Sequence, residues 1–327
     1  MSHYSNCYEQ EEKELLEQKI KYNKTWFISG GTGTLGKCIT KLLCEKYNPK
    51  EIKIFSRDEF KQKEMEVEYK KYNTKISYML GDIRDFERLK LAMARCDYVI
   101  HAAALKDIIK AENDPIECIK TNVEGSKNIA LASIYNGIKK GILISTDKAV
   151  YPVNLYGSTK MTAERLFIDS NKYHDTLFSV CRYGNVIGSR GSVIQLFQKQ
   201  KQEGSLKITD FGMTRFWITV EEVAQFVLDS LYETKGKEIF IPKMKSCYIK
   251  NVADIIAPEC KQIEIGIRES EKLHECLITE EESHHAKILE NKYIIDYNYN
   301  NPIPFSYTSK DCIMSMDELK EKIKEFI

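Results

Sequence analysis

A glycine-rich turn between an apolar run and a helical pattern is the feature that most restricts how this chain can fold. The run at residues 25–29 is followed by Gly30-Gly31-Thr32-Gly33-Thr34-Leu35-Gly36, and a helix is predicted over residues 34–47. Glycine lets backbone amides approach a pyrophosphate, and the amino end of a helix favours negative charge. The turn therefore predicts a dinucleotide site. The residues expected to contact the cofactor here are Gly30, Gly33, Thr34, Leu35 and Gly36.

Short apolar runs and helical patterns alternate from residue 25 to about residue 181. The strands are predicted at residues 25–29, 51–55, 75–80, 97–101, 140–145 and 176–181. This alternation is typical of βαβ units in a parallel sheet. We therefore expect an α/β fold with a Rossmann-like, doubly wound parallel sheet, in which ligands bind at the carboxyl ends of the strands.

The end of the second predicted strand distinguishes the two nicotinamide cofactors. An NAD site has an acidic side chain there for the ribose 2′-hydroxyl, whereas this strand ends in Phe55-Ser56-Arg57-Asp58. Ser56 and Arg57 suit a 2′-phosphate, and Lys61 adds positive charge from the next helical turn. Asp58 keeps NAD open as an alternative, but the pattern favours NADP.

Asp82 and Ile83 follow the third predicted strand, at the same edge of the sheet. We expect both residues beside the adenine of the cofactor. The alternative for Asp82 is that its carboxylate caps the next helix.

Tyr156 and Lys160 are four residues apart and therefore share one face of a helix. A free tyrosine has a pKa of about 10 and is a poor base at neutral pH. A nearby ammonium group and a bound cationic nicotinamide favour its phenolate, which can take a proton from a hydroxyl as hydride leaves the same carbon. The pair follows a nucleotide turn and a strand ending at Ser145, so it predicts a hydride-transfer enzyme.

The regular alternation ends after Arg182, which indicates a second region. We expect residues 25–183 to form an NADP-binding Rossmann domain, to which residues 217–242 return. Residues 184–216 and 243–327 are predicted to form a smaller, mixed C-terminal substrate-binding lobe, with some of its chain returning to the sheet. An N-terminal helical extension is expected over residues 1–24, with an amphipathic helix at residues 9–21.

Charge and composition exclude several classes of function. The net charge is +1, so no general affinity for nucleic acid or an anionic membrane is expected. The ten cysteines include no C-x-x-C pair, and the six histidines lack metal-ligand spacing, so no metal site is expected. No apolar run is long enough to span a bilayer, and the first residues lack an apolar leader, which together predict a cytoplasmic protein.

Four longer motifs resemble a known family of nucleotide-sugar enzymes. They are IHAAALK (100–106), STDKA (145–149), RYGNVIGSRGSV (182–193) and MTRFWIT (213–219). With the glycine-rich turn, Tyr156 and Lys160, they resemble the extended short-chain dehydrogenase/reductases. More narrowly, they are similar to the soluble, C5-inverting UDP-N-acetylglucosamine 4,6-dehydratases that begin pseudaminic acid synthesis. The similarity extends from about residue 25 to residue 280.

The resemblance implies an NADP-dependent lyase that forms UDP-2-acetamido-2,6-dideoxy-β-L-arabino-hex-4-ulose. It implies that Asp147 is the acid at the C6 oxygen and Lys148 the base at C5, beside the catalytic residues Thr146, Tyr156 and Lys160. The further cofactor contacts that it implies are Ala102, Lys106, Ser145, Tyr156 and Lys160. The substrate contacts that it implies are Lys106, Asn185, Arg190, Thr209 and Arg268. Related enzymes assemble as homo-oligomers, often hexamers.

The chemistry of this reaction needs the residue types that follow Thr146. A 4,6-dehydration moves hydride from C4 to NADP⁺, removes water across C5–C6 and returns hydride to C6. One group must take the C5 proton and another must protonate the departing hydroxyl, whereas simple epimerases have no use for such a pair. A lysine base must be neutral, so we expect burial or the cofactor's charge to lower the pKa of Lys148. The alternative for Asp147-Lys148 is a surface ion pair in a loop.

Several positions depart from the family pattern and keep other functions open. Glu269-Ser270 replaces a Pro-Gly after the arginine that matches Arg268, so the turn chemistry differs there. Ala149-Val150-Tyr151-Pro152 is similar to the capsule branch, whereas Tyr156 favours the pseudaminic acid branch. The alternatives are another nucleotide-sugar 4,6-dehydratase or epimerase of the capsule type, and a non-enzymatic NADP-binding module. The intact Tyr156 and Lys160 argue against the module, and Asp147-Lys148 argues against an epimerase.

Overall fold

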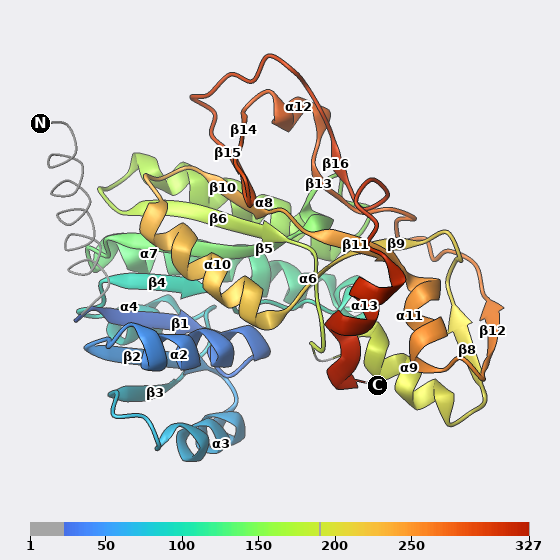
Figure 1. Ribbon diagram of the computed structural model, residues 1–327. Helices are drawn as coiled ribbons and strands as arrows, with labels where there is room; N and C mark the ends of the chain where they lie inside the picture. Colours follow the sequence, from blue (N-terminus) through green and yellow to red (C-terminus); the bar gives the residue numbers. More distant parts are fainter. Residues whose placement is uncertain (1–22, 190, 327) are drawn as a thin grey trace, which may run out of the picture.

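A nine-stranded sheet forms the centre of the computed structural model, which describes residues 23–189 and 191–326 (Figure 1). Its strand order is β14-β15-β10-β6-β5-β4-β1-β2-β3. The parallel strands are β3 (Ile76–Leu80), β2 (Glu51–Ser56), β1 (Thr25–Ser29), β4 (Tyr98–His101), β5 (Lys140–Thr146), β6 (Leu177–Tyr183) and β10 (Ile239–Pro242). Two antiparallel strands, β15 (Lys292–Ile295) and β14 (Ala286–Ile288), complete one edge. The predicted Rossmann-like α/β fold with a parallel sheet is confirmed.

The direction in which strands are added reverses between β1 and β4. From β1 the chain moves outward through β2 and β3, and it then crosses back to β4 and continues through β5 and β6. At such a reversal, the segments that follow the two central strands separate and leave a crevice at their carboxyl ends. The glycine-rich turn after β1 and the His-Ala-Ala-Ala segment after β4 both lie at this crevice.

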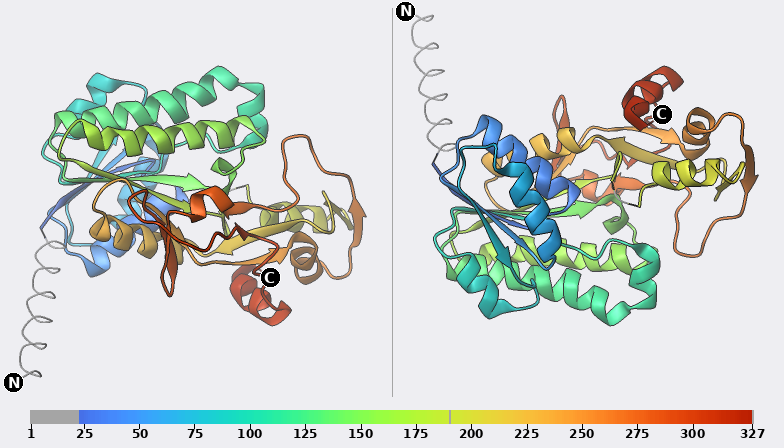
Figure 2. Two further views of the ribbon diagram at one scale, coloured as in Figure 1. Left: turned by 90° about the horizontal axis from the view of Figure 1, so that it is seen from above. Right: turned by 90° about the horizontal axis from the view of Figure 1, so that it is seen from below.

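Helices cover both faces of the sheet (Figure 2). One face carries α2 (Thr34–Lys46) and α10 (Val220–Glu233), which pack against each other. The opposite face carries α4 (Phe86–Ala92), α7 (Gly125–Tyr135) and α8 (Leu155–Asp169). The outer strands β2 and β3 are linked by α3 (Glu59–Tyr69), and β4 is followed by α5 (Ile108–Asn113), α6 (Pro115–Ile119) and the π-helical turn η1 (Lys120–Glu124).

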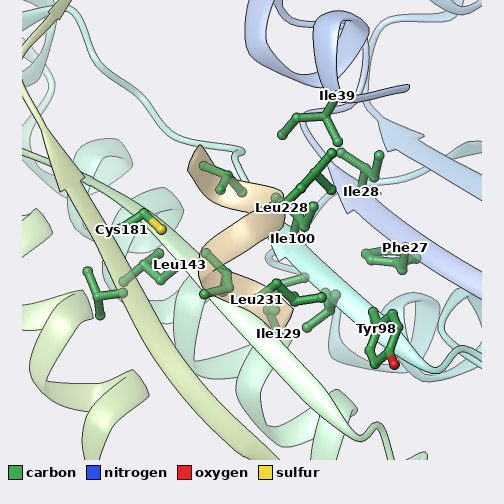
Figure 3. Close-up of a cluster of buried hydrophobic side chains, with 14 of the residues drawn as sticks. Phe27, Ile28, Ile39, Tyr98, Ile100, Ile129, Leu143, Cys181, Leu228 and Leu231 are labelled. Atoms are coloured by element: carbon green, nitrogen blue, oxygen red, sulfur yellow. The ribbon is translucent and has the colours of Figure 1, made fainter. Parts of the chain in front are cut away.

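The hydrophobic core surrounds the central strands. All five residues of β1 are buried, because neighbouring strands and helices cover both of its faces. Phe27 and Ile28 lie in a cluster with Leu143 of β5 and with Leu228 and Leu231 of α10 (Figure 3). Burial on both faces explains why β1 is a continuous apolar run rather than an alternating one.

A smaller lobe with its own core adjoins the carboxyl edge of the sheet. It contains the sheet β11-β9-β7, the pair β12-β8 and three helices. The bounds are β7 (Asn185–Val186), α9 (Val193–Lys201), β8 (Ser205–Ile208), β9 (Thr214–Ile218), β11 (Lys245–Tyr248), α11 (Ile249–Ile256), β12 (Lys261–Glu264) and α13 (Met316–Ile323). Its buried apolar cluster includes Phe197, Trp217, Val252 and Leu319. Because β7 follows β6 almost directly, the lobe begins at the carboxyl end of β6.

The C-terminal part of the chain alternates between the two regions. Residues 286–295 return to the main sheet as β14 and β15, while α13 packs in the lobe. A further strand pair joins β13 (Cys276–Ile278), which precedes β14, to β16 (Tyr307–Thr308), which follows β15. Helix α12 (Glu280–Ser283) follows β13. The helix predicted at residues 9–21 lies outside the residues that the structure describes.

A buried ion-pair network joins β6 to α8 and α12. The Arg182 side chain is 2% exposed, and its Nη2 lies 2.7 Å from Glu164 Oε2 while its Nη1 lies 2.8 Å from Glu282 Oε2. The same Nη1 donates a hydrogen bond of 2.9 Å to the carbonyl of Leu277. Because the guanidinium has partners on three elements, it fixes α8 relative to the sheet.

Replacing Arg182 with Met removes this cation while keeping much of the side-chain volume. Glu164 then stays buried without its partner, so we expect the free energy of unfolding to fall by about 3–5 kcal/mol. Urea denaturation at neutral pH measures the loss. Arg165→Met, on the exposed face of the same helix, is the matched control and should change the stability by less than about 0.5 kcal/mol. Equal losses in the two variants would contradict the role given to the network.

Candidate active site

A cleft of about 1230 Å³ follows the carboxyl edge of the sheet and is bordered by the lobe. Among its lining residues are all those predicted to bind the cofactor, which come from segments far apart in the sequence. They are Gly30, Gly33, Thr34, Leu35, Gly36, Ser56, Arg57, Lys61, Asp82, Ile83, Ala102, Lys106, Ser145, Tyr156 and Lys160. The sheet therefore brings these side chains to one continuous surface.

The glycine-rich turn passes very close to the segment after β4. Gly30 has a φ of +67°, and a Cβ at this position would lie 2.8 Å from the backbone of Ala103. Helix α2 begins after Gly33, which has no side chain to cap it. The amides of the first turn of α2 therefore receive no hydrogen bond from a capping side chain. Uncapped amides at a helix start, beside a backbone that carries no side chain, fit the pyrophosphate of a dinucleotide.

Asp58, the residue that kept NAD open, caps the helix after β2. Its Oδ1 accepts a hydrogen bond of 3.0 Å from the backbone amide of Lys61, and its Oδ2 pairs with the Lys61 ammonium. Ser56 accepts a hydrogen bond of 3.0 Å from Gln62 Nε2. The Arg57 side chain is 62% exposed, and its Nη1 lies 3.4 Å from Asp82 Oδ2. The carboxylate of Asp58 is thus engaged in the cap, while Arg57 extends along the cleft.

Asp82 does not cap the next helix, so that alternative is wrong. The cap of α4 is Asp85, whose carboxylate accepts from the amide of Arg88. Asp82 instead binds Arg84 through Nε and Nη2, at 3.0 and 2.7 Å. Burial acts to raise the pKa of Asp82, but the hydrogen bonds and charge of Arg84 lower it below its usual value. Asp82 therefore contributes a carboxylate, held by Arg84, to the lining of the cleft.

His101 lies beneath the cleft at the end of β4. Its Nδ1 is 2.6 Å from Ser29 Oγ and its Nε2 is 3.0 Å from Ser126 Oγ. Burial, and to a lesser extent the charge of Lys160, lower the pKa of His101 to about 3. The imidazole is therefore neutral at physiological pH and connects β1, β4 and α7.

Tyr156 and Lys160, the predicted catalytic pair, lie in the first turns of α8, which touches the loop after β5. Asn154 caps α8 by accepting from the amide of Gly157. A Cβ on Gly157 would overlap the carbonyl oxygen of Lys148, so glycine permits this close approach. Tyr156 consequently faces the Thr146-Asp147-Lys148 segment, whose last two residues lie in the 3₁₀ turn η2 (Asp147–Ala149).

The chain's own groups do not favour the phenolate of Tyr156. Burial raises its pKa to about 12, although the Lys148 ammonium and a hydrogen bond with Thr146 act in the opposite direction. Burial also lowers the pKa of Lys160 to about 8, partly offset by Glu164. Tyr156 therefore needs additional positive charge in the cleft before it can act as a base.

Asp147 is buried and Lys148 is largely buried at the cleft, so the alternative of a surface ion pair is wrong. The Asp147 side chain is 0% exposed, and Lys148 Nζ lies 2.9 Å from its Oδ1. Lys148 Nζ is also 3.3 Å from Asn185 Oδ1 and 3.3 Å from Glu275 Oε1. The other oxygen of Asp147, Oδ2, is buried without a hydrogen-bond partner among the described residues.

The charge state of Lys148 differs from the expectation. Burial acts to lower the pKa of Lys148, but Asp147 and Glu275 outweigh it and hold the pKa above its ordinary value. For Asp147, burial raises the pKa despite the neighbouring ammonium. Burial therefore does not lower the pKa of Lys148 as expected, because two carboxylates flank the amine.

Residues 26–297 match the family described as polysaccharide biosynthesis protein. This chain belongs to that family. Over 277 residues it is 50% identical to the UDP-N-acetylglucosamine 4,6-dehydratase (inverting) of Campylobacter jejuni strain 81-176, covering 83% of this chain and 82% of the relative. It is also 39% identical to the UDP-glucose 4-epimerase of Rickettsia canadensis, with 85% of each chain covered.

The fold of this polysaccharide biosynthesis family member is also found in a solved structure. The X-ray structure of Pen from Bacillus thuringiensis superposes with a TM-score of 0.88 at 34% identity. The match covers 94% of this chain and 98% of Pen. The resemblance inferred from the sequence motifs, to the inverting 4,6-dehydratases within the extended short-chain dehydrogenase/reductases, is confirmed.

Only some of the residues predicted to contact the substrate line the cleft of this family member. Lys106, Asn185 and Arg268 line the cleft, and Arg268 Nη1 lies 3.5 Å from Glu271 Oε1. Thr209 follows β8 and is not among the lining residues. Arg190 lies outside the residues that the structure describes.

Two features of the site were missed from the sequence. Ser145 donates a hydrogen bond to the buried Glu164, which Arg182 holds in place. Glu275 lies against Lys148 although it is distant from it in the sequence. Arg182 begins one of the four family motifs, but a sequence pattern does not reveal that a glutamate is buried beside a cation.

Neither a metal site nor a membrane span is found in the part of the chain that the structure describes. No group of three or more candidate metal ligands occurs among residues 23–189 and 191–326. Within the same residues, no helix combines the length and apolar character needed to cross a bilayer. The cysteines described there are unpaired.

His101 should make the stability of the fold depend on pH. Its folded pKa is depressed to about 3, so its contribution is complete above the unfolded pKa of about 6.5 and is lost as pH falls toward 3. Between pH 7 and pH 5, we expect the wild type to lose about 2 kcal/mol more than His101→Asn, which cannot be protonated. Urea unfolding at both values measures this difference, and parallel losses would show that His101 is not buried as a neutral ring.

Proposed function

We propose that this protein is a C5-inverting UDP-N-acetylglucosamine 4,6-dehydratase that uses NADP. The observation that supports this proposal most strongly is the buried Asp147–Lys148 pair, which faces Tyr156 in a cleft that begins at a dinucleotide turn. An enzyme that only transfers hydride needs Tyr156 and Lys160. An acid and a base beside them are needed when water must also be removed.

The cofactor fits the residues of the cleft. The uncapped start of α2 would hold the pyrophosphate, and Ser56, Arg57 and Lys61 would surround the ribose 2′-phosphate. Asp82 and Ile83 would meet the adenine, while Ala102, Lys106 and Ser145 would meet the nicotinamide end. When bound, NADP⁺ accepts hydride from C4 of the sugar and later returns it to C6. The engagement of Asp58 in the α3 cap favours NADP over NAD, because that carboxylate is not available to the ribose.

Tyr156 would take the proton of the C4 hydroxyl as the C4 hydrogen leaves. Thr146, which is hydrogen-bonded to Tyr156, would orient the same oxygen. The buried Lys160 lies four residues along the same helix, and a bound nicotinamide would add the further positive charge that favours the phenolate. The resulting 4-keto group makes the hydrogen on C5 acidic.

The Asp147–Lys148 pair would supply both the acid and the base from one shared proton. Moving a proton from the Lys148 ammonium to the Asp147 carboxylate gives an amine beside a carboxylic acid, with no change in net charge. The amine takes the C5 proton as the C5–C6 double bond forms, and the acid protonates the C6 oxygen, which leaves as water. The pair is then ammonium and carboxylate again. Because the configuration at C5 inverts, the proton that C5 regains would arrive at the face opposite the one that the amine deprotonates.

The substrate would lie between these groups and the lobe. Lys106 and Asn185 border the catalytic end of the cleft, and Arg268 is a candidate partner for the diphosphate because its guanidinium matches phosphate geometry. For Arg190 and Thr209, contact with the substrate is proposed from the family resemblance alone. By the same resemblance, we propose that the enzyme acts in the cytoplasm as a homo-oligomer.

A 4-epimerase is the second candidate, because a relative that bears that name is 39% identical to this chain. An epimerase returns hydride to C4 and removes no water. It therefore leaves the hydrogen on C5 in place and gives the buried Asp147–Lys148 pair no task.

Incubation with UDP-N-acetylglucosamine and NADP⁺ in D₂O tests the proposal. We expect a 6-deoxy-4-keto sugar of L-arabino configuration with deuterium at C5, observed by NMR. A product that is only the 4-epimer would contradict the dehydratase, and a 4-keto product with unchanged C5 configuration would contradict the inverting type. Lys148→Ala should abolish the 4-keto product while still binding NADP⁺.

Cofactor preference should depend on Arg57. In Arg57→Ala, we expect the affinity for NADP⁺ to fall about tenfold or more, because a phosphate contact is lost, while NAD⁺ affinity changes little. Calorimetric titration with each cofactor measures both constants. Lys63→Ala, on the neighbouring helix α3, removes a charge outside the cleft and should leave both affinities unchanged. Wild-type protein that binds NAD⁺ more tightly than NADP⁺ would overturn the assignment.

A further inference from the structure

Glu275 is a buried carboxylate that lies against the proposed acid–base pair but does not line the cleft. It is 2% exposed, and its Oε1 is 3.3 Å from Lys148 Nζ and 3.6 Å from Arg215 Nε. Its Oε2 is 3.6 Å from Lys272 Nζ and makes no hydrogen bond among the described residues. Glu275 can therefore influence the substrate only through Lys148 and Asp147.

The backbone holds Glu275 in this position. Its amide donates a hydrogen bond of 2.9 Å to Ser309 Oγ, and its carbonyl accepts one of 2.8 Å from the amide of Ser309. The neighbouring Lys272 donates to the carbonyl of Val150, which ties the same segment to the catalytic loop. A carboxylate fixed in this way keeps a constant distance from Lys148.

Three further charged or titratable groups lie around Glu275 and the pair. The pair itself lies in η2, while Tyr156 comes from α8, Arg215 from β9 and Lys272 from the loop before β13. The adjacent His274 points instead to Thr214, whose Oγ1 is 2.8 Å from its Nδ1. Burial acts to raise the pKa of Glu275, but Lys148, Arg215 and Lys272 keep it below the ordinary value. Glu275 is thus a permanent negative charge beside the pair.

We propose that Glu275 is a positioning residue whose charge sets the pH range in which the Asp147–Lys148 pair can carry out elimination. This inference rests on the proposed function, in which the pair must hold one proton that its two members share. With two protons the pair lacks a base, and with none it lacks an acid. A fixed negative charge favours protonation of both members, so it moves both limits toward higher pH.

Glu275 is also one of three side chains that place an oxygen atom next to the Lys148 ammonium. The acceptors around Lys148 Nζ are Asp147 Oδ1, Asn185 Oδ1 and Glu275 Oε1, each from a different part of the fold. This arrangement directs Nζ toward a point between the loop after β5 and the start of the lobe. Loss of Glu275 should therefore change the titration of Lys148 as well as its position.

The pH profile of kcat/KM for Glu275→Gln tests the proposal. We expect both limbs of the profile to move toward lower pH by about one unit, because the same charge acts on both members of the pair. The matched control is Glu238→Gln, which alters a buried carboxylate bonded to Ser179 and Thr234 and should leave both limbs in place. Unmoved limbs in Glu275→Gln, or limbs that move in opposite directions, would overturn the proposal.

A second variant predicts the opposite shift and covers the case in which Glu275→Gln does not fold. Lys272→Met removes a positive charge next to Glu275, so both limbs should move toward higher pH. Glu275→Asp keeps the charge and should retain the wild-type pH range even if kcat falls. A downward shift in Lys272→Met would contradict the electrostatic origin of the effect.

A measurement without turnover separates this inference from the proposed function. In protein labelled with ¹³C-lysine, the NMR signal of Lys148, assigned from Lys148→Arg, should begin to titrate at lower pH in Glu275→Gln than in the wild type. An unchanged titration overturns the role of Glu275. Absence of a 4-keto product from the wild type would instead overturn the dehydratase, and the titration would still decide whether Glu275 controls the pair.

Discussion

The close approach of the turn after β1 to the backbone after β4 is the contact on which the site depends. Because Gly30 has no side chain, the two central strands can end side by side at the point where the strand order reverses. All parallel strands then present their carboxyl ends to one cleft. The glycine-rich turn, the residues after β2 and the loop after β5 consequently face a common space.

Two buried clusters of charged side chains lie beside this cleft. They differ in how many of their buried polar atoms have hydrogen-bond partners. Arg182 has a carboxylate or carbonyl partner on three elements, so its network is saturated and holds α8 in place. In the second cluster, Asp147 Oδ2 and Glu275 Oε2 make no hydrogen bonds among the described residues. Incompletely satisfied buried carboxylates are costly to stability. Their presence beside Lys148 is consistent with a site where protons move.

Much of the fold and the cofactor site was predictable because local patterns encode it. The apolar runs, the glycine spacing and the four-residue spacing of Tyr156 and Lys160 depend on neighbours in the chain. The predicted strand at residues 140–145 corresponds to β5 over Lys140–Thr146, and the helix at residues 34–47 to α2 over Thr34–Lys46. The ionisation of Lys148 was predicted in the wrong direction, because the flanking Glu275 comes from a distant segment.

Residue types and their spacing alone thus determined the class of the sheet, the dinucleotide turn and the presence of an aspartate and a lysine directly after Thr146. Only the tertiary structure decided that Asp58 serves a helix cap, that Asp82 binds Arg84, and that Asp147 and Lys148 are buried with Glu275. The physical reason is that burial and electrostatic fields depend on groups that are close in space. A linear sequence shows which groups can ionise, but the folded chain decides which of them lie close enough to change one another's charge.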